Sequence, residues 1–415
     1  MSLFLVRIPL ALLIVAGCDS GGVVAPAADL AVAAPDLGTI DDLGTPPQID
    51  GGGADLVTLP VIELEWIPRG SAGLEGAIID ASPDETGNVW AVSDGALFIR
   101  RGGASSFRKY TNADGLHVSS SIKSVAGGGM DDGWVGLEGH ETDYPDLDPP
   151  DLKRLGKAEH VWLNRDNTLR TLHYAEMHND GDAAHWETRT AYRLLYVHEG
   201  PAAGHLFLGG NHGVVHVFDD KWGDHIHVEL YLEPQHVMSF GLWNGLAVDP
   251  ATGELWTCGK TACGLEHWIA DPHQWAVAAH YRYAFTVFSG DHGLEEPSGY
   301  REDHVGTALA PDGTAYFLSK TDGLAAWKPN GFNYEQIKAV PVPSLNTPVD
   351  LAADPDGTLW VADARRLIRF DPGTGMAQTI VLPSGDLRRL YLDNRVNPRA
   401  LYVSTGGGLA IYRGK

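Results

Sequence analysis

The stretch that decides the fold is TPVDLAADPDGTLWVADARRLIRFDPGTGMAQTIVL, residues 347–382. It contains a short apolar strand, a Pro-Asp-Gly turn and an aromatic strand, followed by a charged turn, a second aromatic strand, another turn and a last strand. Proline fixes φ at the first turn position, and Asp and Gly tolerate the backbone conformations that follow. The stretch therefore predicts a four-stranded antiparallel unit.

The same unit recurs along most of the chain. A second clear copy is HVGTALAPDGTAYFLSKTDGLAAWKPNGFNYEQIKAV, residues 304–340, and weaker copies begin near Ala77, Ser121, Ala191 and Asn244. Four strands on a period of roughly 40–50 residues form the unit of a β-propeller blade. Aromatic residues at the strand centres would fill the space between neighbouring blades. The pattern predicts an all-β fold, a β-propeller over residues 59–415.

The last unit of the pattern has only three obvious strands and ends at Gly414. A missing fourth strand would leave open sheet edges. Residues 61–66, Val-Ile-Glu-Leu-Glu-Trp, alternate in polarity just before the first unit. We expect them to supply that strand and close the ring, which makes seven four-stranded blades the best count and leaves six or eight open.

The repeat resembles bacterial propeller repeats grouped with the WD40/YVTN-like and two-component-regulator-propeller families. The resemblance rests on GNVWAVSDGALFIRR (87–101) and FRKYTNADGL (107–116), and it covers about residues 60–415. It implies the fold but no particular activity, because propellers host lyases, hydrolases, sensors and scaffolds. The His–Glu–His cluster of streptogramin lyases, another branch of such propellers, has no identifiable match in this sequence.

The N-terminus has the features of an export signal. Arg7 precedes an apolar run from Ile8 to Ala16 that is too short to span a bilayer and fits a signal peptide. The run ends in Val15-Ala16-Gly17-Cys18, which resembles the lipobox of bacterial lipoproteins. The resemblance implies that residues 1–17 are removed and that Cys18 is lipidated, anchoring the chain to a membrane of the cell envelope. An ordinary secretory signal with an incidental cysteine is the alternative.

Residues 18–58 are rich in Ala, Pro, Asp and Gly and contain no aromatic residue. Such a segment cannot bury enough surface to offset the entropy of ordering it, so we expect a disordered tether between the anchor and the propeller. The formal net charge of the full sequence is −24. An acidic surface repels phosphate backbones, which argues against nucleic acid as a partner.

Histidine is distributed unevenly: all 18 histidines fall between His117 and His304. Loops between blades, and loops joining second to third strands, open on one face of a propeller. On the predicted blade boundaries, several histidines and an aspartate gather on that face, where propellers often hold ligands. The predicted ligand-binding residues are His140, His178, His185, His212, His292, Asp303 and His304.

A divalent metal is the candidate cofactor of this face, because histidine is a common metal ligand. The candidate metal ligands are His140, His212, His292 and His304. No subset has tight metal-ligand spacing such as His-Glu-x-x-His, and an ordinary solvated rim is the alternative. The Pro-rich insertion at residues 140–160 is interpreted either as a lid over the same face or as loop decoration.

Cys258 and Cys263 are the two cysteines left after Cys18. They flank a four-residue turn between two predicted strands, and an exported protein meets oxidising conditions. We therefore expect a disulfide, with free thiols or soft metal ligands as alternatives.

Three functions are compatible with this sequence. The first is an envelope-anchored binding module for a protein, peptide or glycan ligand at the His- and acid-rich face. The second is a metal-assisted lyase or hydrolase whose site lies on the same face of the propeller. The third is a passive structural protein of the envelope. The first is preferred because no phosphate-binding loop, dinucleotide fingerprint or nucleophile elbow is found, and no catalytic residue is assigned.

Overall fold

The computed structural model describes most of the predicted propeller. The described residues are 62, 64–116, 121–139, 157–173, 190–210, 214–219, 226–232, 243–259, 263–267, 280–285, 304–320, 323–330, 333–337 and 340–414. Leu59–Lys415 forms one compact unit. The signal peptide and tether predicted for residues 1–58 lie outside the described residues.

The described strands form seven four-stranded antiparallel sheets, which we call blades 1 to 7. The first four blades are β2–β5 (Asp80–Pro83, Val89–Ser93, Ala96–Arg100, Arg108–Tyr110), β6–β9 (Ile122–Gly127, Asp132–Leu137, Lys157–Leu163, Leu169–His173), β10–β13 (Arg193–Tyr196, Leu206–Gly209, Val214–Asp219, Ile226–Leu232) and β14–β17 (Gly245–Val248, Leu255–Cys258, Cys263–His267, His280–Phe285).

Blades 5 and 6 are the two clearest copies of the sequence repeat, and blade 7 joins the two ends of the unit. They are β18–β21 (His304–Leu309, Ala315–Ser319, Gly323–Asn330, Asn333–Ile337), β22–β25 (Pro348–Ala353, Leu359–Asp363, Arg366–Phe370, Ala377–Ile380) and β26–β28 (Leu387–Asp393, Ala400–Thr405, Gly408–Arg413) with β1 (Leu64–Pro68). A 3-10 turn, η1 (Asn112–Asp114), follows blade 1.

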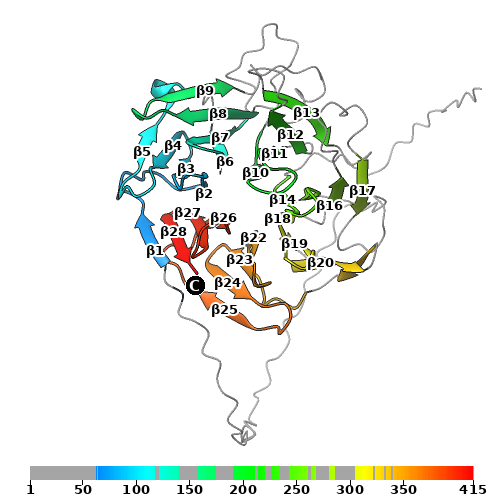
Figure 1. The fold of residues 1–415 in the computed structure, drawn as a ribbon. Helices are drawn as coiled ribbons and strands as arrows, with labels where there is room; N and C mark the ends of the chain where they lie inside the picture. Colours follow the sequence, from blue (N-terminus) through cyan, green and yellow to red (C-terminus); the bar gives the residue numbers. More distant parts are fainter. Residues whose placement is uncertain are drawn as a thin grey trace, which may run out of the picture. The chain divides into compact units, whose positions relative to one another are not determined.

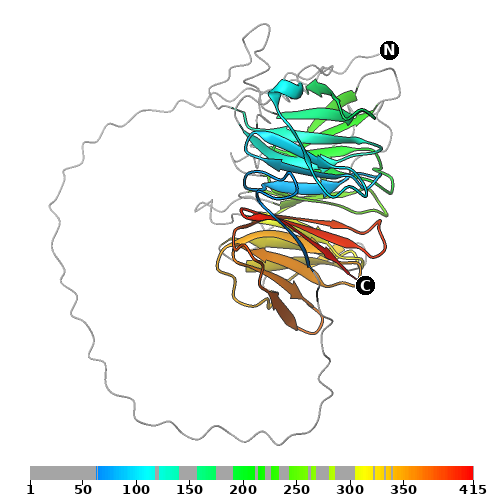
Figure 2. The ribbon, with the colours of Figure 1, turned by 90° about the vertical axis from the view of Figure 1, so that its left-hand side faces the viewer.

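The blades are arranged in a ring, as the sequence predicts for a β-propeller. The first strand of each blade contacts the first strand of the next, and β26 of blade 7 returns to β2 of blade 1 (Figure 1). The first strands therefore surround the axis of the ring, which we call the channel. Figure 2 shows the ring from its edge, with the strands running between its two faces.

Blade 7 is closed by the N-terminal strand. β1 pairs antiparallel with β28, with Leu64 opposite Tyr412 and Pro68 opposite Gly408. The strand lies slightly later in the sequence than the predicted 61–66. Ile67 of this strand is buried in a core that also contains Leu74 and Phe98 of the blade 1 region. The N-terminal strand thus contributes to the packing between blades 7 and 1 as well as to hydrogen bonding.

Each hydrophobic core lies between two neighbouring blades. Trp90 and Leu97 of blade 1 pack with Val125 and Val135 of blade 2, and Trp256 of blade 4 packs with Phe317 of blade 5. Side chains alternate between the two faces of a strand, so each blade offers one apolar face to each neighbour. A blade without its neighbour would leave that face in water.

The turn between the first and second strands fixes a tryptophan in two of the blades. In blade 1, Asp84 accepts hydrogen bonds from the Thr86 amide at 2.9 Å and from Trp90 Nε1 at 3.0 Å. Asp354 accepts the equivalent bond from Trp360 Nε1 at 3.1 Å in blade 6. The aspartate therefore closes the turn and satisfies the only polar atom of a fully buried indole.

The antiparallel order gives the ring two distinct faces. Turns from first to second strands and from third to fourth strands lie on one, which we call the turn face. Connections between blades, and turns from second to third strands, lie on the other, which we call the connection face. The predicted histidine-rich site belongs to the connection face.

Candidate functional site

The predicted lipidation site Cys18 and most of the predicted ligand-binding residues lie outside the described residues. The ligand-binding residues concerned are His140, His178, His185, His212, His292 and Asp303, and most of the insertion at 140–160 lies outside as well. Their roles stay predictions. Within the described ranges no group of three or more His, Cys, Asp or Glu side chains could hold a metal ion, and no helix is long and apolar enough to cross a bilayer.

His304 is the one predicted ligand that the structure places. It is the first residue of β18, directly after the connection from blade 4, and it is fully buried. Its Nδ1 lies 3.0 Å from the Gly259 carbonyl oxygen, at the end of β15 in blade 4. A carbonyl only accepts, so Nδ1 carries the proton. His304 therefore links blades 4 and 5 instead of standing on an exposed rim, and its role as a metal ligand stays a prediction.

The two cysteines of blade 4 lie at the ends of paired strands. Cys258 is disulfide-bonded. Its Cα partner across the β15–β16 ladder is Cys263. Cys263 as the bonded partner stays the prediction made from the sequence.

Sequence reasoning missed a set of charged residues in the channel. Arg193 of β10, in blade 3, donates from Nη1 to Asp350 Oδ2 of β22, in blade 6, at 2.6 Å, and from Nη2 to the Leu390 carbonyl of blade 7 at 3.2 Å. The Asp350 side chain is 1 % exposed and that of Arg193 is 13 % exposed. This ion pair connects blades that are three apart in the ring.

A second arginine crosses the channel in the opposite direction. Arg389 of β26 donates from Nη2 to the Tyr192 carbonyl at 3.1 Å and to Asn244 Oδ1 at 2.9 Å. Tyr192 and Asn244 directly precede β10 and β14, in the blades farthest from blade 7. Burial lowers the pKa of Arg389, and the neighbouring Arg193 adds to this effect.

Carboxylates balance the two arginines. Burial would lower the pKa of Arg193, but Asp350 and Asp80 outweigh it and the pKa is raised. Asp80 of β2 accepts from the Val125 amide at 3.1 Å, and burial raises its pKa although both arginines oppose that shift. Two arginines and two aspartates thus form one neutral, buried network, which satisfies the condition for keeping charge inside a protein.

Another arginine spans the channel near the turn face. Arg395, in the β26–β27 turn, donates from Nη1 to His198 Nδ1 at 2.7 Å and from Nε to Asp393 at 2.8 Å. Because arginine is always a donor, Nδ1 of His198 accepts and its Nε2 carries the proton. Glu85 Oε1 lies 3.5 Å from the same Nδ1. Since Nδ1 carries no proton, it cannot donate a hydrogen bond to this carboxylate. Burial and Arg395 lower the pKa of His198 to about 3.

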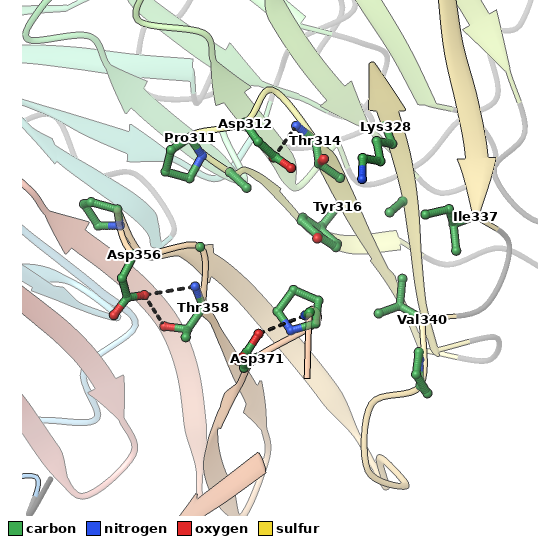
Figure 3. Close-up of a pocket in the computed structure, with 17 residues that line it drawn as sticks. Pro311, Asp312, Thr314, Tyr316, Lys328, Ile337, Val340, Asp356, Thr358 and Asp371 are labelled. Atoms are coloured by element: carbon green, nitrogen blue, oxygen red, sulfur yellow. Dashed lines mark hydrogen bonds between the residues drawn. The ribbon is translucent and has the colours of Figure 1, made fainter. Parts of the chain in front are cut away.

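A groove opens on the turn face of the described part of the ring. It lies between blades 5 and 6, has a volume of about 530 Å³ and is open to solvent on one side. Figure 3 shows labelled side chains of the two blades facing one another across it. The apolar lining comes from Pro311, Val340, Ile337 and Pro372, and the polar lining includes three aspartates and one lysine.

Tyr316 of β19 lines the groove and carries its central polar atom. The residue is 8 % exposed, and among the described residues no hydrogen-bond partner is found for its hydroxyl group. Burial, together with the charges of Asp312 and Asp371, raises its pKa to about 12. In Figure 3 the tyrosine lies between these two carboxylates.

The three aspartates of the groove differ in their partners. Asp356 is bound by Arg369 at 2.7 Å and by Arg399 at 2.9 Å, and although burial opposes it, these contacts and Thr358 lower its pKa. Asp371 accepts from the Thr374 hydroxyl at 2.6 Å, which lowers its pKa. Asp312 accepts from the Thr314 amide at 3.0 Å.

Comparison with known proteins gives the fold and no closer relationship. No protein-family model and no curated protein sequence match the chain. Virginiamycin B lyase from Staphylococcus aureus is similar in structure, with a TM-score of 0.54, 10% identity, and coverage of 86% of this chain and 100% of that chain. YCF48 bound to D1 peptide has a TM-score of 0.53, 17% identity, and coverage of 86% and 98%.

A third similar structure is the extracellular domain of a hybrid two-component system from B. thetaiotaomicron. Its TM-score is 0.52 at 13% identity, and the match covers 82% of this chain and 39% of that chain. These likenesses show that the compact unit has the β-propeller fold. At such identities they carry no activity from those proteins to this one.

Proposed function

We propose that this chain is an exported, lipid-anchored binding module, and that its propeller holds a peptide segment of a partner protein in the groove between blades 5 and 6. The observation that carries the proposal is the groove itself, at about 530 Å³. Sites for small ligands and side chains are typically concave, largely apolar and furnished with a few convergent polar groups. The groove has these properties.

Two features of the ring favour its turn face over passage through the channel. Arg193 and Arg389 cross the channel near one end of the first strands, and Arg395 crosses it near the other. Because arginine side chains bond across the channel near both of its ends, we place the ligand site on a face of the ring, between two blades. YCF48, which has the same fold, was solved with a bound peptide, and this precedent supports a peptide as ligand.

Export and anchoring are proposed from the N-terminal sequence. The apolar run and the Val-Ala-Gly-Cys motif ending at Cys18 support processing as a lipoprotein. The similar propeller from B. thetaiotaomicron is an extracellular domain, which is compatible with an exported propeller. The Ala-, Pro- and Gly-rich segment 18–58 would then hold the propeller at a distance from the membrane.

Peptide binding is tested with the full mature chain and four acetylated, amidated heptapeptides. Each consists of Gly and Ser around one central residue, which is arginine, lysine, leucine or glutamate. Calorimetric titration should give a dissociation constant below about 1 mM for at least one peptide, which corresponds to roughly 4 kcal/mol of binding free energy.

A matched pair of variants locates the binding. Ile337 lines the groove and is 38 % exposed, whereas Val381 is 81 % exposed and does not line it. Ile337→Arg should abolish binding, because the longer charged side chain occupies the groove, and Val381→Arg should leave it unchanged. If no peptide binds, or if both variants bind like the wild type, the proposed function is wrong.

A further inference from the structure

The polar groups of the groove define a chemical preference. We infer that the groove selects an arginine side chain of its peptide ligand, with the guanidinium group held by the Tyr316 hydroxyl and the carboxylates of Asp312 and Asp371. This inference rests on the proposed function, because it names the ligand of the same site.

The Tyr316 hydroxyl is the first element of the argument. Its ring is buried, its hydroxyl faces the groove, and no described residue is hydrogen-bonded to it. The hydroxyl is not one of the fully buried polar atoms of the described residues, so it is open to the groove that it lines. A donor on a ligand in the groove can therefore reach the hydroxyl oxygen, and a hydrogen bond to a charged donor contributes about 1.5–3 kcal/mol.

The charges beside the hydroxyl identify the donor as a cation. Asp312 and Asp371 both act electrostatically on Tyr316. Neither has a lysine, arginine or histidine within ion-pair distance in the part of the chain that the structure describes, whereas Asp356 has two arginines. The negative charge of these two carboxylates, which line the groove, is therefore available to the ligand. It favours a cationic ligand group over an anionic one.

The shape of the groove favours a side chain with an apolar stem. Val340, Ile337 and four prolines belong to its lining, together with the tyrosine. Arginine buries its three methylene groups along apolar surface while its charged end reaches polar partners. Its planar fork carries five N–H donors, so one guanidinium can serve a hydroxyl and two carboxylates, which a compact ammonium does less well.

Among the described residues that line the groove, Lys328 is the one cation. It lies on β20 and is exposed, and in Figure 3 it stands on the opposite side of Tyr316 from Asp371. Its positive charge repels a cationic ligand and so weakens binding. Removing that charge should strengthen binding of the arginine peptide. The variant therefore changes the affinity in the opposite direction from substitutions of Tyr316 and Asp312.

The test compares the arginine heptapeptide with an identical peptide that carries citrulline, the neutral analogue of the same shape. The citrulline peptide should have a dissociation constant about tenfold higher. Hydrogen bonds to a charged group contribute roughly 1 kcal/mol more than those to a neutral group, and about 1.4 kcal/mol corresponds to a factor of ten in affinity. Tyr316→Phe and Asp312→Asn should each weaken the arginine peptide several-fold, and Lys328→Met should strengthen it. Asp386→Asn, an exposed carboxylate outside the groove, is the matched control and should change nothing.

The outcomes separate this inference from the proposed function. If citrulline binds as tightly as arginine, or if Asp312→Asn and Asp386→Asn behave alike, the arginine assignment is overturned. If the leucine or glutamate peptide binds best and Ile337→Arg abolishes that binding, the groove remains the peptide site while its assignment to arginine is wrong. Circular dichroism of each variant shows whether it is folded, and Tyr316→Phe removes only a hydroxyl without a described partner.

Discussion

Arg193 and Asp350 show how one charged pair can hold together parts of the chain that are far apart in sequence. They are 157 residues apart and lie in blades 3 and 6. Asp350 also accepts from the Leu390 amide of blade 7 at 2.8 Å. A single carboxylate thus joins three blades around the channel, and its loss would leave a buried guanidinium without its ion partner.

We expect Asp350→Asn to lower the free energy of unfolding by about 3 kcal/mol, the typical cost of breaking a buried pair by removing one charge. The change keeps the size of the side chain and leaves Arg193 charged. Urea-induced unfolding of the variant measures this loss. Asp386→Asn, whose carboxylate is 61 % exposed and 3.0 Å from Arg388, should cost less than about 0.5 kcal/mol. Equal losses in the two variants would refute a special role for the channel pair.

His198 makes stability depend on pH. An unfolded histidine takes up a proton below about pH 6.5, whereas folded His198, buried and next to Arg395, has a pKa of about 3. The unfolded state binds more protons between these values. The contribution of His198 is therefore complete above pH 6.5 and is lost as the pH falls towards 3.

His198→Asn provides the comparison, because the asparagine oxygen can still accept from Arg395 but does not titrate. Between pH 7 and pH 4.5 the wild type should lose about 2 kcal/mol more unfolding free energy than this variant. His205, with a pKa lowered by burial to about 4, is present in both proteins and cancels. Identical losses in the two proteins would show that His198 is not a neutral, buried group.

The sequence could not predict these residues because their partners come from distant blades. The repeat shows where a first strand lies, but the blade that faces it across the channel depends on the blade number and the ring geometry. A usable signal existed: Asp350, Arg193 and Arg389 are charged residues in first strands, which line the channel. The uneven distribution of histidine pointed instead to loops on the connection face.

At the scale of elements, the sequence repeat predicts the structure well. The turns with Asp and Gly separate the first and second strands at 84–88 and at 354–358, where Gly87 and Gly357 have φ of +80° and +86°. Such positive angles favour glycine, which is why the turn can be recognised from sequence. The groove was not predictable in this way, because Tyr316 and Asp371 belong to different repeats.

β1 gives a direct test at this scale. Deleting residues 59–67 removes most of the strand that pairs with β28 and takes Ile67 and Trp66 from the packing of blade 7. We expect the melting temperature to fall by about 10 °C, because several kcal/mol of burial and pairing are lost. Deleting residues 20–50 should leave it nearly unchanged. If both deletions behave alike in calorimetry, the ring is not closed by this strand.

At the scale of the whole molecule, the propeller is proposed to work at the end of a lipid-anchored tether. Cys18→Ser should abolish lipidation, because no other residue near the proposed cleavage point offers a thiol. Mass spectrometry of the wild-type mature protein should find an acylated Cys18 at its N-terminus. An unmodified Cys18 would contradict the anchor while leaving the propeller and its groove unaffected.

The central claim is that the groove between blades 5 and 6 holds the peptide ligand, and hydrogen–deuterium exchange tests it most directly. The mature chain is compared with and without whichever of the four heptapeptides binds most tightly. The account predicts slower exchange in the turns at 311–314 and 371–376, and unchanged exchange in the turns at 128–131 and 394–399 on the same face. Slower exchange confined to other blades or to the connection face would contradict it.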